Sequence, residues 1–414
     1  MIKNIRIRNY KSIVDLTLDL GRFNVIIGTN GCGKSNILEA ITMASAASQN
    51  KLDAVSLKYR GIRETEPQFM MNAFDDIEQD ESNPIIQIDI ESSERPEGTS
   101  AIIRYSNQER EWKNQGDITD EVYGLILGKE INETLKSLLK KSNDFNEDIK
   151  KEFNEFLSNE RYKDFLAFSV RNKGKIDKNT IEETFGRSFL EPLPDAKYYS
   201  KYIAFRPVEK VLRDFNSKTT YPLGNRGEGL FQYLKELSKD DNNRDFFDRI
   251  NDGLRMLDWF DGFKIPEDLL SNEYKLSIGD KFLKDSLHYF DQRSTNEGFL
   301  YLLFFLTLFN SKDTPQFFAV DNIETSFNPG LCQSLIKYLI KTTKKNEKQV
   351  ILTTHNPFVL DGMDLSDDEV RLFVCRRNID GHTKIERVKY REDRKMSLSE
   401  LWMSGLIGAL PENF

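Results

Sequence analysis

The 414-residue sequence lacks several features that mark whole classes of protein. No stretch approaches the roughly 18 uncharged apolar residues that a membrane-spanning helix needs. The first residues alternate apolar and charged types, whereas a signal peptide needs an unbroken apolar core. We therefore expect a cytoplasmic protein that makes no contact with a membrane.

Cysteine and histidine are also scarce, and basic residues are not in excess. Cys32, Cys332 and Cys375 stand far apart and form no C-x-x-C pair, so neither a disulfide framework nor a zinc site is indicated. Because the sequence contains only three histidines, we do not expect a metal centre built from histidines. The net charge of −8 argues against a protein that coats nucleic acid, although a local basic patch would still allow DNA binding.

The sequence does contain a regular succession of strands and helices. Period-2 alternation at residues 2–8 and 14–20 predicts a hairpin of half-buried strands, and the apolar run before Gly28 predicts a buried strand that leads into a helix from 35 to 47. Further buried strands are expected at 316–321 and 349–355, with a helix between them. The run 299–309 is apolar on nearly every face, which predicts a deeply buried helix. A hairpin at 369–390 and a last helix at 397–410 complete the pattern.

Changes in composition divide the chain into four parts. We expect an N-terminal lobe with a phosphate loop at 1–105, and a mainly helical insertion at 106–200, where Lys, Glu and Asn dominate. A C-terminal lobe would follow at 201–365, and then a C-terminal hairpin and helix at 366–414. The predicted fold class is therefore α/β with an inserted helical region.

The segment IIGTNGCGKSN matches the pattern G-x-x-x-x-G-K-[ST] between a predicted strand and a predicted helix. Glycines let consecutive backbone N–H groups turn toward an anion, and the following helix adds its positive end. Lys34 would reach the β- and γ-phosphates of a nucleotide, and Ser35 would bind Mg²⁺. The predicted phosphate-binding residues are Asn30, Gly31, Cys32, Gly33, Lys34, Ser35 and Asn36.

Two later strands end in side chains that suit the same site. Asp321 follows the strand FFAV and is the expected metal-binding carboxylate, together with Ser35. His355 follows the strand VILTT, where it could contact the γ-phosphate or orient the attacking water. A histidine satisfied inside the core is the alternative.

These motifs resemble those of the ABC-type ATPases related to RecF, to the structural-maintenance-of-chromosomes (SMC) heads and to the overcoming-lysogenization-defect (OLD) proteins. YKSI…VIIGTNGCGKSNILEAI resembles their start, DNIETSFNP their D-E-P-E-x-x-L-H-P stretch, and TTHNPFVLD their switch-histidine segment. LWMSGLIGALPENF resembles a tail found on stand-alone members. The resemblance covers residues 1–45 and about 290–414, and it implies a P-loop NTPase fold of the ABC-ATPase head type.

The resemblance also implies that two copies pair head to tail around ATP. Each ATP would lie between the phosphate loop of one copy and the signature motif of the other, usually S-x-G, which aligns here with Asn296 and Gly298. Ser294 and Thr295 are alternatives for the serine, and Asn296 also suits the N-cap of the buried helix. Lys11 matches a basic position that approaches the nucleotide in relatives, or it is an exposed lysine at a strand end.

Asn322 stands where this family has a glutamate that polarises the attacking water. An asparagine cannot accept a proton at neutral pH. General-base catalysis contributes about 10²–10⁴-fold, so we expect slow ATP hydrolysis with ATP binding intact. Glu324 could replace the missing base, or Asn322 and His355 could position the water without one. Gln68 is the single candidate for the family's glutamine loop. The catalytic candidates are therefore Asp321, Asn322, Glu324 and His355.

The implied function is an ATP-switched regulator. Resemblance to OLD-type proteins implies anti-phage defence. Because the chain ends soon after the last hairpin, without room for a fused nuclease, we expect a homodimer or larger homo-oligomer that acts on a separate effector, a nuclease. The alternatives are a scaffold that binds ATP only to dimerise, and a RecF-like DNA-binding repair ATPase. The candidate DNA contacts, unless they are ordinary surface charges, are Lys136, Lys140, Lys141, Arg376 and Arg377.

Overall fold

The computed structural model describes residues 1–63, 65–74, 85–93, 96, 98–106, 111–115, 198–214, 222–266, 275–284, 289–392 and 396–408. The predicted helical insertion at 106–200 lies almost entirely outside the described residues, and so do Lys136, Lys140 and Lys141.

One layer is an antiparallel sheet in the order β2-β1-β4-β5-β6. Its strands are β1 (Ile2–Tyr10), β2 (Ile13–Asp19), β4 (Ile85–Ser92), β5 (Thr99–Ser106) and β6 (Glu111–Asn114). β1 and β2 pair with Ile7 opposite Leu16, which confirms the predicted hairpin. The sheet continues past residue 105, because β6 pairs with β5.

A second sheet carries the phosphate loop and has the order β14-β13-β3-β12-β11-β7. Its strands are β3 (Phe23–Ile27), β7 (Ala204–Phe205), β11 (Phe317–Val320), β12 (Gln349–Thr353), β13 (Val370–Arg377) and β14 (Thr383–Val388). All neighbours are parallel except β14, which is antiparallel to β13. Because the carboxyl ends of parallel strands meet at one edge, the segments after β3, β7, β11 and β12 are brought together there.

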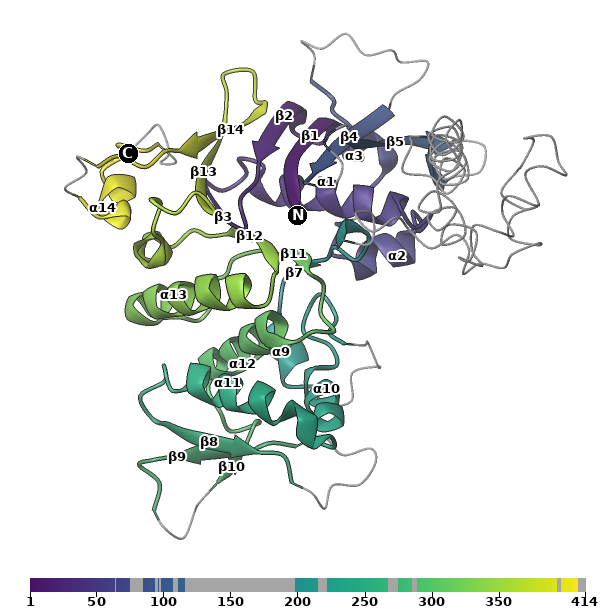
Figure 1. Cartoon of the computed structure of the whole chain (residues 1–414). Coiled ribbons are helices and arrows are strands. Elements are labelled where there is room, and N and C mark those ends of the chain that lie inside the picture. Colours follow the sequence, from purple (N-terminus) through teal and green to yellow (C-terminus); the bar gives the residue numbers. More distant parts are fainter. Residues whose placement is uncertain are drawn as a thin grey trace, which may run out of the picture.

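The strands of the second sheet separate two hydrophobic cores. Ile26 faces the core that contains helix α1 (Lys34–Ala47) and the antiparallel sheet, whereas Val25 and Ile27 face the other core. This follows from the alternation of side chains along a strand. Helix α1 is therefore enclosed between two sheets, and the phosphate loop before it is held on a rigid support (Figure 1).

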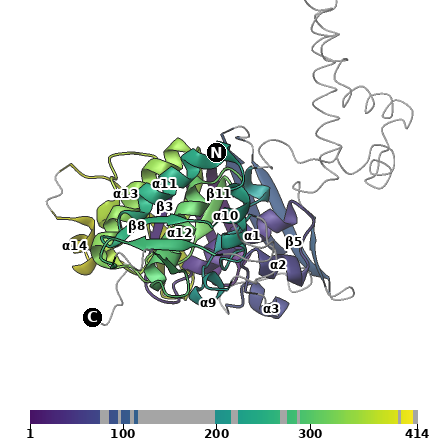
Figure 2. The ribbon, with the colours of Figure 1, turned by 90° about the horizontal axis from the view of Figure 1, so that it is seen from below.

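The second core surrounds α12 (Glu297–Asn310), in which every residue from Gly298 to Asn310 is buried, as predicted. Around it lie α9 (Glu209–Leu212), α10 (Leu230–Leu237), η2 (Asp241–Asn243), α11 (Arg244–Leu254) and α13 (Pro329–Lys345). A small sheet of β8 (Phe260–Lys264), β9 (Ser277–Asp280) and β10 (Phe290–Asp291) closes the far end of this lobe, at the bottom of Figure 1. Figure 2 looks onto that end of the molecule.

The remaining helices are α2 (Ala54–Tyr59), α3 (Pro67–Met70), η3 (Pro357–Gly362) and α14 (Leu398–Met403). The last one is shorter than the predicted helix at 397–410. Gly405 and Gly408 adopt left-handed φ angles of 75° and 76°, which end an α-helix. Within the described ranges, no helix has the length and apolar character needed to span a bilayer.

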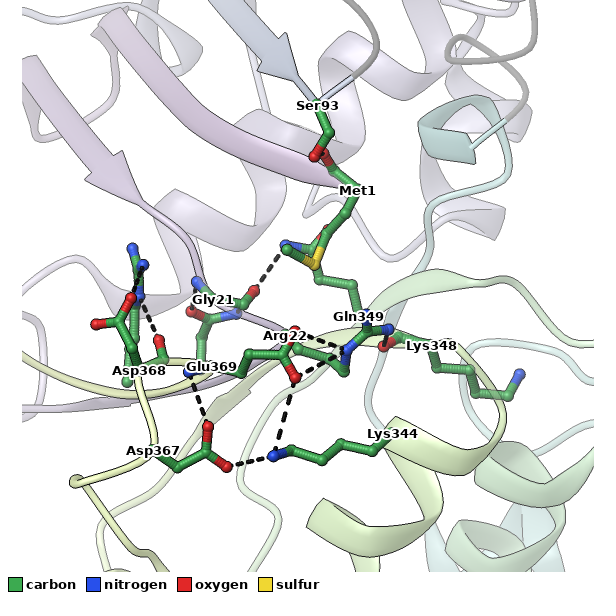
Figure 3. A network of polar contacts seen from close by, with 12 residues as sticks. Met1, Gly21, Arg22, Ser93, Lys344, Lys348, Gln349, Asp367, Asp368 and Glu369 are labelled. Atoms are coloured by element: carbon green, nitrogen blue, oxygen red, sulfur yellow. Dashed lines mark hydrogen bonds and ion pairs between the residues drawn. The ribbon is translucent and has the colours of Figure 1, made fainter.

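Polar contacts join the two large sheets at the edge opposite the phosphate loop (Figure 3). The buried Gln349 amide accepts the Ile2 N–H at 2.9 Å and donates to the carbonyls of Ile2 and Gly21, both at 2.7 Å. Arg22, just before β3, places Nε 3.4 Å from both carboxylate oxygens of Glu369. These bonds fix the start of β3 against the strands around it.

Candidate functional site

The loop between β3 and α1 is built around glycines. Gly33 has a φ of 112°, and a Cβ there would lie 2.1 Å from Thr383 Oγ1. At Gly28 a Cβ would lie 2.2 Å from the Cys375 carbonyl oxygen. A Cβ at either position would clash with the β13–β14 hairpin. Glycine is therefore needed both for the turn and for its close packing on that hairpin.

Lys34 is the first residue of α1, and its side chain folds into this loop. Its ammonium donates to the carbonyls of Gly28 at 2.7 Å and Thr29 at 3.0 Å. Both acceptors are neutral, and a phosphate oxygen is a stronger partner for an ammonium than a carbonyl. Lys34 is therefore placed to bind an anion that enters the loop.

Thr383 of β14 supports the loop from outside. Its hydroxyl donates to the Cys32 carbonyl at 2.9 Å and is hydrogen-bonded to Ser12 Oγ at 2.7 Å. Asn36 Nδ2 in turn donates to the same Ser12 oxygen at 2.8 Å. The chain immediately after β1, the loop and the C-terminal hairpin thus share one chain of hydrogen bonds, which no local motif predicts.

Two of the candidate DNA contacts lie in the described residues, on the same hairpin. Arg377 Nε donates to the Gly31 carbonyl at 2.9 Å, and Arg376 pairs with Glu386. Arg377 therefore holds the phosphate loop, and Arg376 has a carboxylate partner in its own hairpin. Neither contact favours DNA binding over ordinary structural pairing.

The Cys32 side chain lies next to the ammonium group of Lys34. Its sulfur lies 3.8 Å from the Lys34 ammonium and is buried next to Cys375. A hydrogen bond from the Cys375 thiol, helped by the Lys34 charge, lowers the pKa of the Cys32 thiol to about 6 against the opposing effect of burial. Both effects favour the thiolate form of Cys32.

Ser35 and Asp321 meet at the predicted metal site. Ser35 Oγ donates to Asp321 Oδ2 at 3.0 Å, and the Thr353 hydroxyl donates to the other carboxylate oxygen. A hydroxyl and a carboxylate are hard oxygen donors of the kind Mg²⁺ prefers. Together with the glycine-lined loop and its lysine, this donor set fits a magnesium–nucleotide complex.

The other catalytic candidates lie on the neighbouring loops after β11 and β12. Asn322 is exposed, has a left-handed φ of 59°, and donates its N–H to Thr353 Oγ1 at 3.0 Å. Glu324 Oε1 accepts the backbone N–H of His355 at 2.9 Å, and its Oε2 is buried with no hydrogen-bond partner in the described part of the chain. Burial, and then the Lys34 charge, hold the pKa of His355 below its ordinary value. The ring is therefore neutral at pH 7 and can donate a hydrogen bond.

A charge cluster that the motifs did not predict lies beside Asp321. Arg206, the residue after β7, places Nε 2.6 Å from Asp321 Oδ2. Glu39, whose side chain is fully buried one turn after Ser35, pairs with Lys11 at 2.6 Å, with Arg63 at 2.6 Å and with Arg206 at 3.6 Å. Lys11 thus lies close to the site, with Glu39 as its partner.

Gln68, the glutamine-loop candidate, donates its side-chain amide to Glu66 at 2.9 Å. The long polar side chain beside Asp321 is Arg206 instead. The signal that could have found it is a charged residue directly after a predicted parallel strand, because that position faces the ligand edge of such a sheet.

Asn296 and Gly298 lie in the second lobe. The Asn296 side chain caps α12 by accepting the Phe299 N–H at 2.8 Å, as predicted. A Cβ on Gly298 would lie 3.3 Å from the carbonyl of Ser326, in the loop that follows Asp321. Their contact with ATP bound to a second copy stays a prediction. Of the two alternatives, the Ser294 hydroxyl donates to Asp291, and the Thr295 hydroxyl is buried and has no hydrogen-bond partner within the ranges that the structure describes.

Comparison with known proteins assigns the chain to a protein family. Residues 23–361, which include the phosphate loop, Asp321 and His355, match the family model described as "AAA domain, putative AbiEii toxin, Type IV TA system". The chain belongs to this AAA domain family. No curated protein matches it.

Solved structures with a similar fold include heads of SMC proteins. The chain resembles an SMC head bound to the C-terminal winged-helix domain of ScpA, with 11% identity and a TM-score of 0.54 over 95% of this chain and 99% of that one. An SMC head from Pyrococcus furiosus has 13% identity and a TM-score of 0.48 over 98% of each chain. One from Thermotoga maritima has 13% identity and a TM-score of 0.44 over 94% of this chain and 99% of that one. The predicted α/β fold of a P-loop ATPase head is confirmed.

Proposed function

We propose that this AAA domain protein binds ATP with Mg²⁺, hydrolyses it slowly, and uses the ATP-bound state to self-associate and to regulate a separate effector, a nuclease, in defence against phage. The observation that carries the proposal is the meeting of Ser35 and Asp321, 3.0 Å apart, beside the phosphate loop. The residue next to this metal site is Asn322, not a carboxylate, which favours a long-lived ATP-bound state.

The side chains divide the work of phosphoryl transfer. Lys34 binds the phosphates, and Ser35 and Asp321 hold Mg²⁺, which when bound neutralises charge on the phosphate oxygens. The neutral His355 ring donates a hydrogen bond to the terminal phosphate or to the attacking water. Asn322 positions that water without taking its proton. Glu324, anchored on the His355 N–H, is the carboxylate that could accept the proton instead.

Two findings support a separate protein partner. The SMC head of the matched structure is bound to a domain of ScpA, and the family description contains the words "putative AbiEii toxin, Type IV TA system". Neither names the partner of this chain. The proposal of a nuclease in anti-phage defence rests on the resemblance of DNIETSFNP and TTHNPFVLD to OLD-type motifs.

The first test removes the phosphate-binding amine. Lys34→Ala is expected to abolish measurable equilibrium binding of a fluorescent ATP analogue and ATP-dependent self-association in sedimentation velocity. Lys337→Ala, which removes an exposed lysine of α13, is the control and should leave both unchanged. The proposal fails if Lys34→Ala binds nucleotide and self-associates like the native chain.

A second test separates ATP binding from dimerisation. Asn296→Asp preserves the cap of α12, because aspartate caps a helix as well as asparagine does. It also adds a negative charge where the other copy's terminal phosphate is proposed to lie. We expect native ATP affinity in the monomer and loss of ATP-dependent dimers. Dimers of native strength would show that residues 296–298 do not face the nucleotide of a second copy.

A further inference from the structure

Arg206 occupies the ligand edge of the central sheet directly beside the metal carboxylate. β7 and β11 run parallel with Phe205 opposite Val320, and the Asp321 N–H donates to the Phe205 carbonyl at 2.9 Å. The residue after β7 is therefore held level with Asp321. The Arg206 backbone N–H is also fixed, by the Asn225 carbonyl at 2.7 Å.

The guanidinium uses the atom that a metal ion would use. Arg206 Nε lies 2.6 Å from Asp321 Oδ2, the same oxygen that accepts the Ser35 hydroxyl. A divalent cation bound by that oxygen and by Ser35 would repel a guanidinium at such a distance. The arginine must therefore move when the site is filled, unless an anion comes between the two cations.

A second nitrogen of the guanidinium group, Nη2, lies near the carboxylate of Glu39. Arg206 Nη2 is buried, has no hydrogen-bond partner among the described residues, and lies 3.6 Å from Glu39 Oε1. Glu39 is already paired at 2.6 Å with both Lys11 and Arg63. Arg206 therefore retains a donor nitrogen that has no acceptor among the described residues, and its side chain is 27% exposed.

We propose that Arg206 is a positioning residue with two partners: it neutralises Asp321 in the empty site, and it contacts the terminal phosphate oxygens when Mg²⁺–ATP is bound. Glu39 keeps the guanidinium near the site during the exchange. A guanidinium fork suits phosphate oxygens, and these oxygens would separate it from the metal. The inference rests on the proposed binding of ATP, and it adds that the chain distinguishes ATP from ADP through Arg206.

The first arm measures nucleotide preference. Equilibrium binding of fluorescent ATP and ADP analogues is compared in Mg²⁺ for the native chain and for Arg206→Ala. The loss of one charge-assisted hydrogen bond is expected to weaken ATP binding roughly 10- to 100-fold. ADP affinity should change by less than about 3-fold, because ADP lacks the phosphate that Arg206 contacts. The native preference for ATP should therefore disappear.

The second arm uses Mn²⁺ alone, without nucleotide, and reads bound metal by electron paramagnetic resonance. Removal of the competing cation should let Arg206→Ala bind Mn²⁺ about 10-fold more tightly than the native chain. Arg206→Lys keeps the charge but loses the fork, so it should bind Mn²⁺ as weakly as the native chain and retain only part of the ATP preference. If Arg206→Ala does not fold, the ATP preference of Arg206→Lys tests the proposal instead.

The matched control is Arg22→Ala. Arg22 is similarly half-buried, with 21% of its side chain exposed, and it pairs with the carboxylate of Glu369 at the opposite edge of the same sheet (Figure 3). It should alter neither nucleotide preference nor Mn²⁺ affinity. An unchanged ATP preference or an unchanged Mn²⁺ affinity in Arg206→Ala overturns the proposal for Arg206 alone. A native chain that binds neither nucleotide overturns this proposal and the proposed function together.

Discussion

The replacement of Asn322 by a carboxylate is the sharpest test of why hydrolysis should be slow. Asn322 is exposed, directly follows Asp321, the proposed metal ligand, and adopts a left-handed φ of 59°. Asparagine and aspartate tolerate this conformation better than glutamate does. Two variants are therefore informative: Asn322→Glu, which restores the family's residue, and Asn322→Asp, which adds the charge with little backbone strain.

The expected gain in rate exceeds the expected cost in stability. A general base contributes about 10²–10⁴-fold, or roughly 3 to 5 kcal/mol of the activation barrier. A glutamate in the left-handed region costs about 1–2 kcal/mol, and this cost falls on the folded state, not on the reaction. We therefore expect Asn322→Glu to hydrolyse ATP at least 100-fold faster with a lower Tm, and Asn322→Asp to gain less speed at an almost unchanged Tm.

The assay is phosphate release in a single turnover at saturating ATP, which separates the chemical step from product release. Asn328→Asp makes the same chemical change six residues later, where the side chain caps α13 by accepting the Leu331 N–H at 2.9 Å, and should keep the native rate. If both Asn322 variants bind ATP normally and turn over at the native rate, a missing base does not limit hydrolysis. Glu324→Gln in the native background then shows whether Glu324 already serves, because its loss would slow turnover by about 100-fold or more.

Three further changes test the surroundings of the site. Thr383→Val removes the donor to the Cys32 carbonyl and should weaken ATP binding about 10-fold in the same fluorescence assay, while Thr383→Ser restores it. The ultraviolet absorbance that marks a thiolate should increase as the pH rises through about 6 in the native chain but not in Cys32→Ser, because the pKa of the buried Cys32 thiol is lowered. Cys332, whose pKa burial raises to about 11, should stay protonated at pH 7. Gln349→Leu removes the acceptor of the Ile2 N–H and a donor to the carbonyls of Ile2 and Gly21, and urea unfolding should show a loss of about 2–5 kcal/mol.

Features that depend on local sequence could be predicted from the sequence. A phosphate loop needs glycines, a lysine and a hydroxyl within eight neighbouring positions, and the structure confirms the predicted strand before this segment and the helix after it. The helix at 299–309 is apolar all round, and α12 is buried along the same span. The last helix was predicted too long, because apolar residues continue after Met403 although Gly405 takes a left-handed conformation that ends the helix.

Features that depend on strand order were not predictable in this way. Arg206 lies 115 positions from Asp321 in the sequence, and β7, which aligns the two, is only two residues long. Thr383 reaches the phosphate loop only because β13 pairs with β3 and β14 turns back beside it. Short strands carry too little hydrophobic pattern to reveal such neighbours, so the support of the site became visible only in the folded chain.

The charge balance of the site explains why an anionic ligand would act as a switch. Arg206 bridges Glu39 and Asp321, and the other cations bound to Glu39 are Lys11 and Arg63. These three cations share two carboxylates, and Lys34 adds a fourth cation whose ammonium bonds are to neutral carbonyls. Even when the Cys32 sulfur, 3.8 Å from the Lys34 ammonium, is counted as an anion, these four cations outnumber the anions that contact them, and they repel one another. Mg²⁺–ATP carries the opposite charge, so its binding would relieve this repulsion, and departure of the terminal phosphate would restore it and return Arg206 to Asp321. A slow chemical step at Asn322 would keep the site in the balanced state.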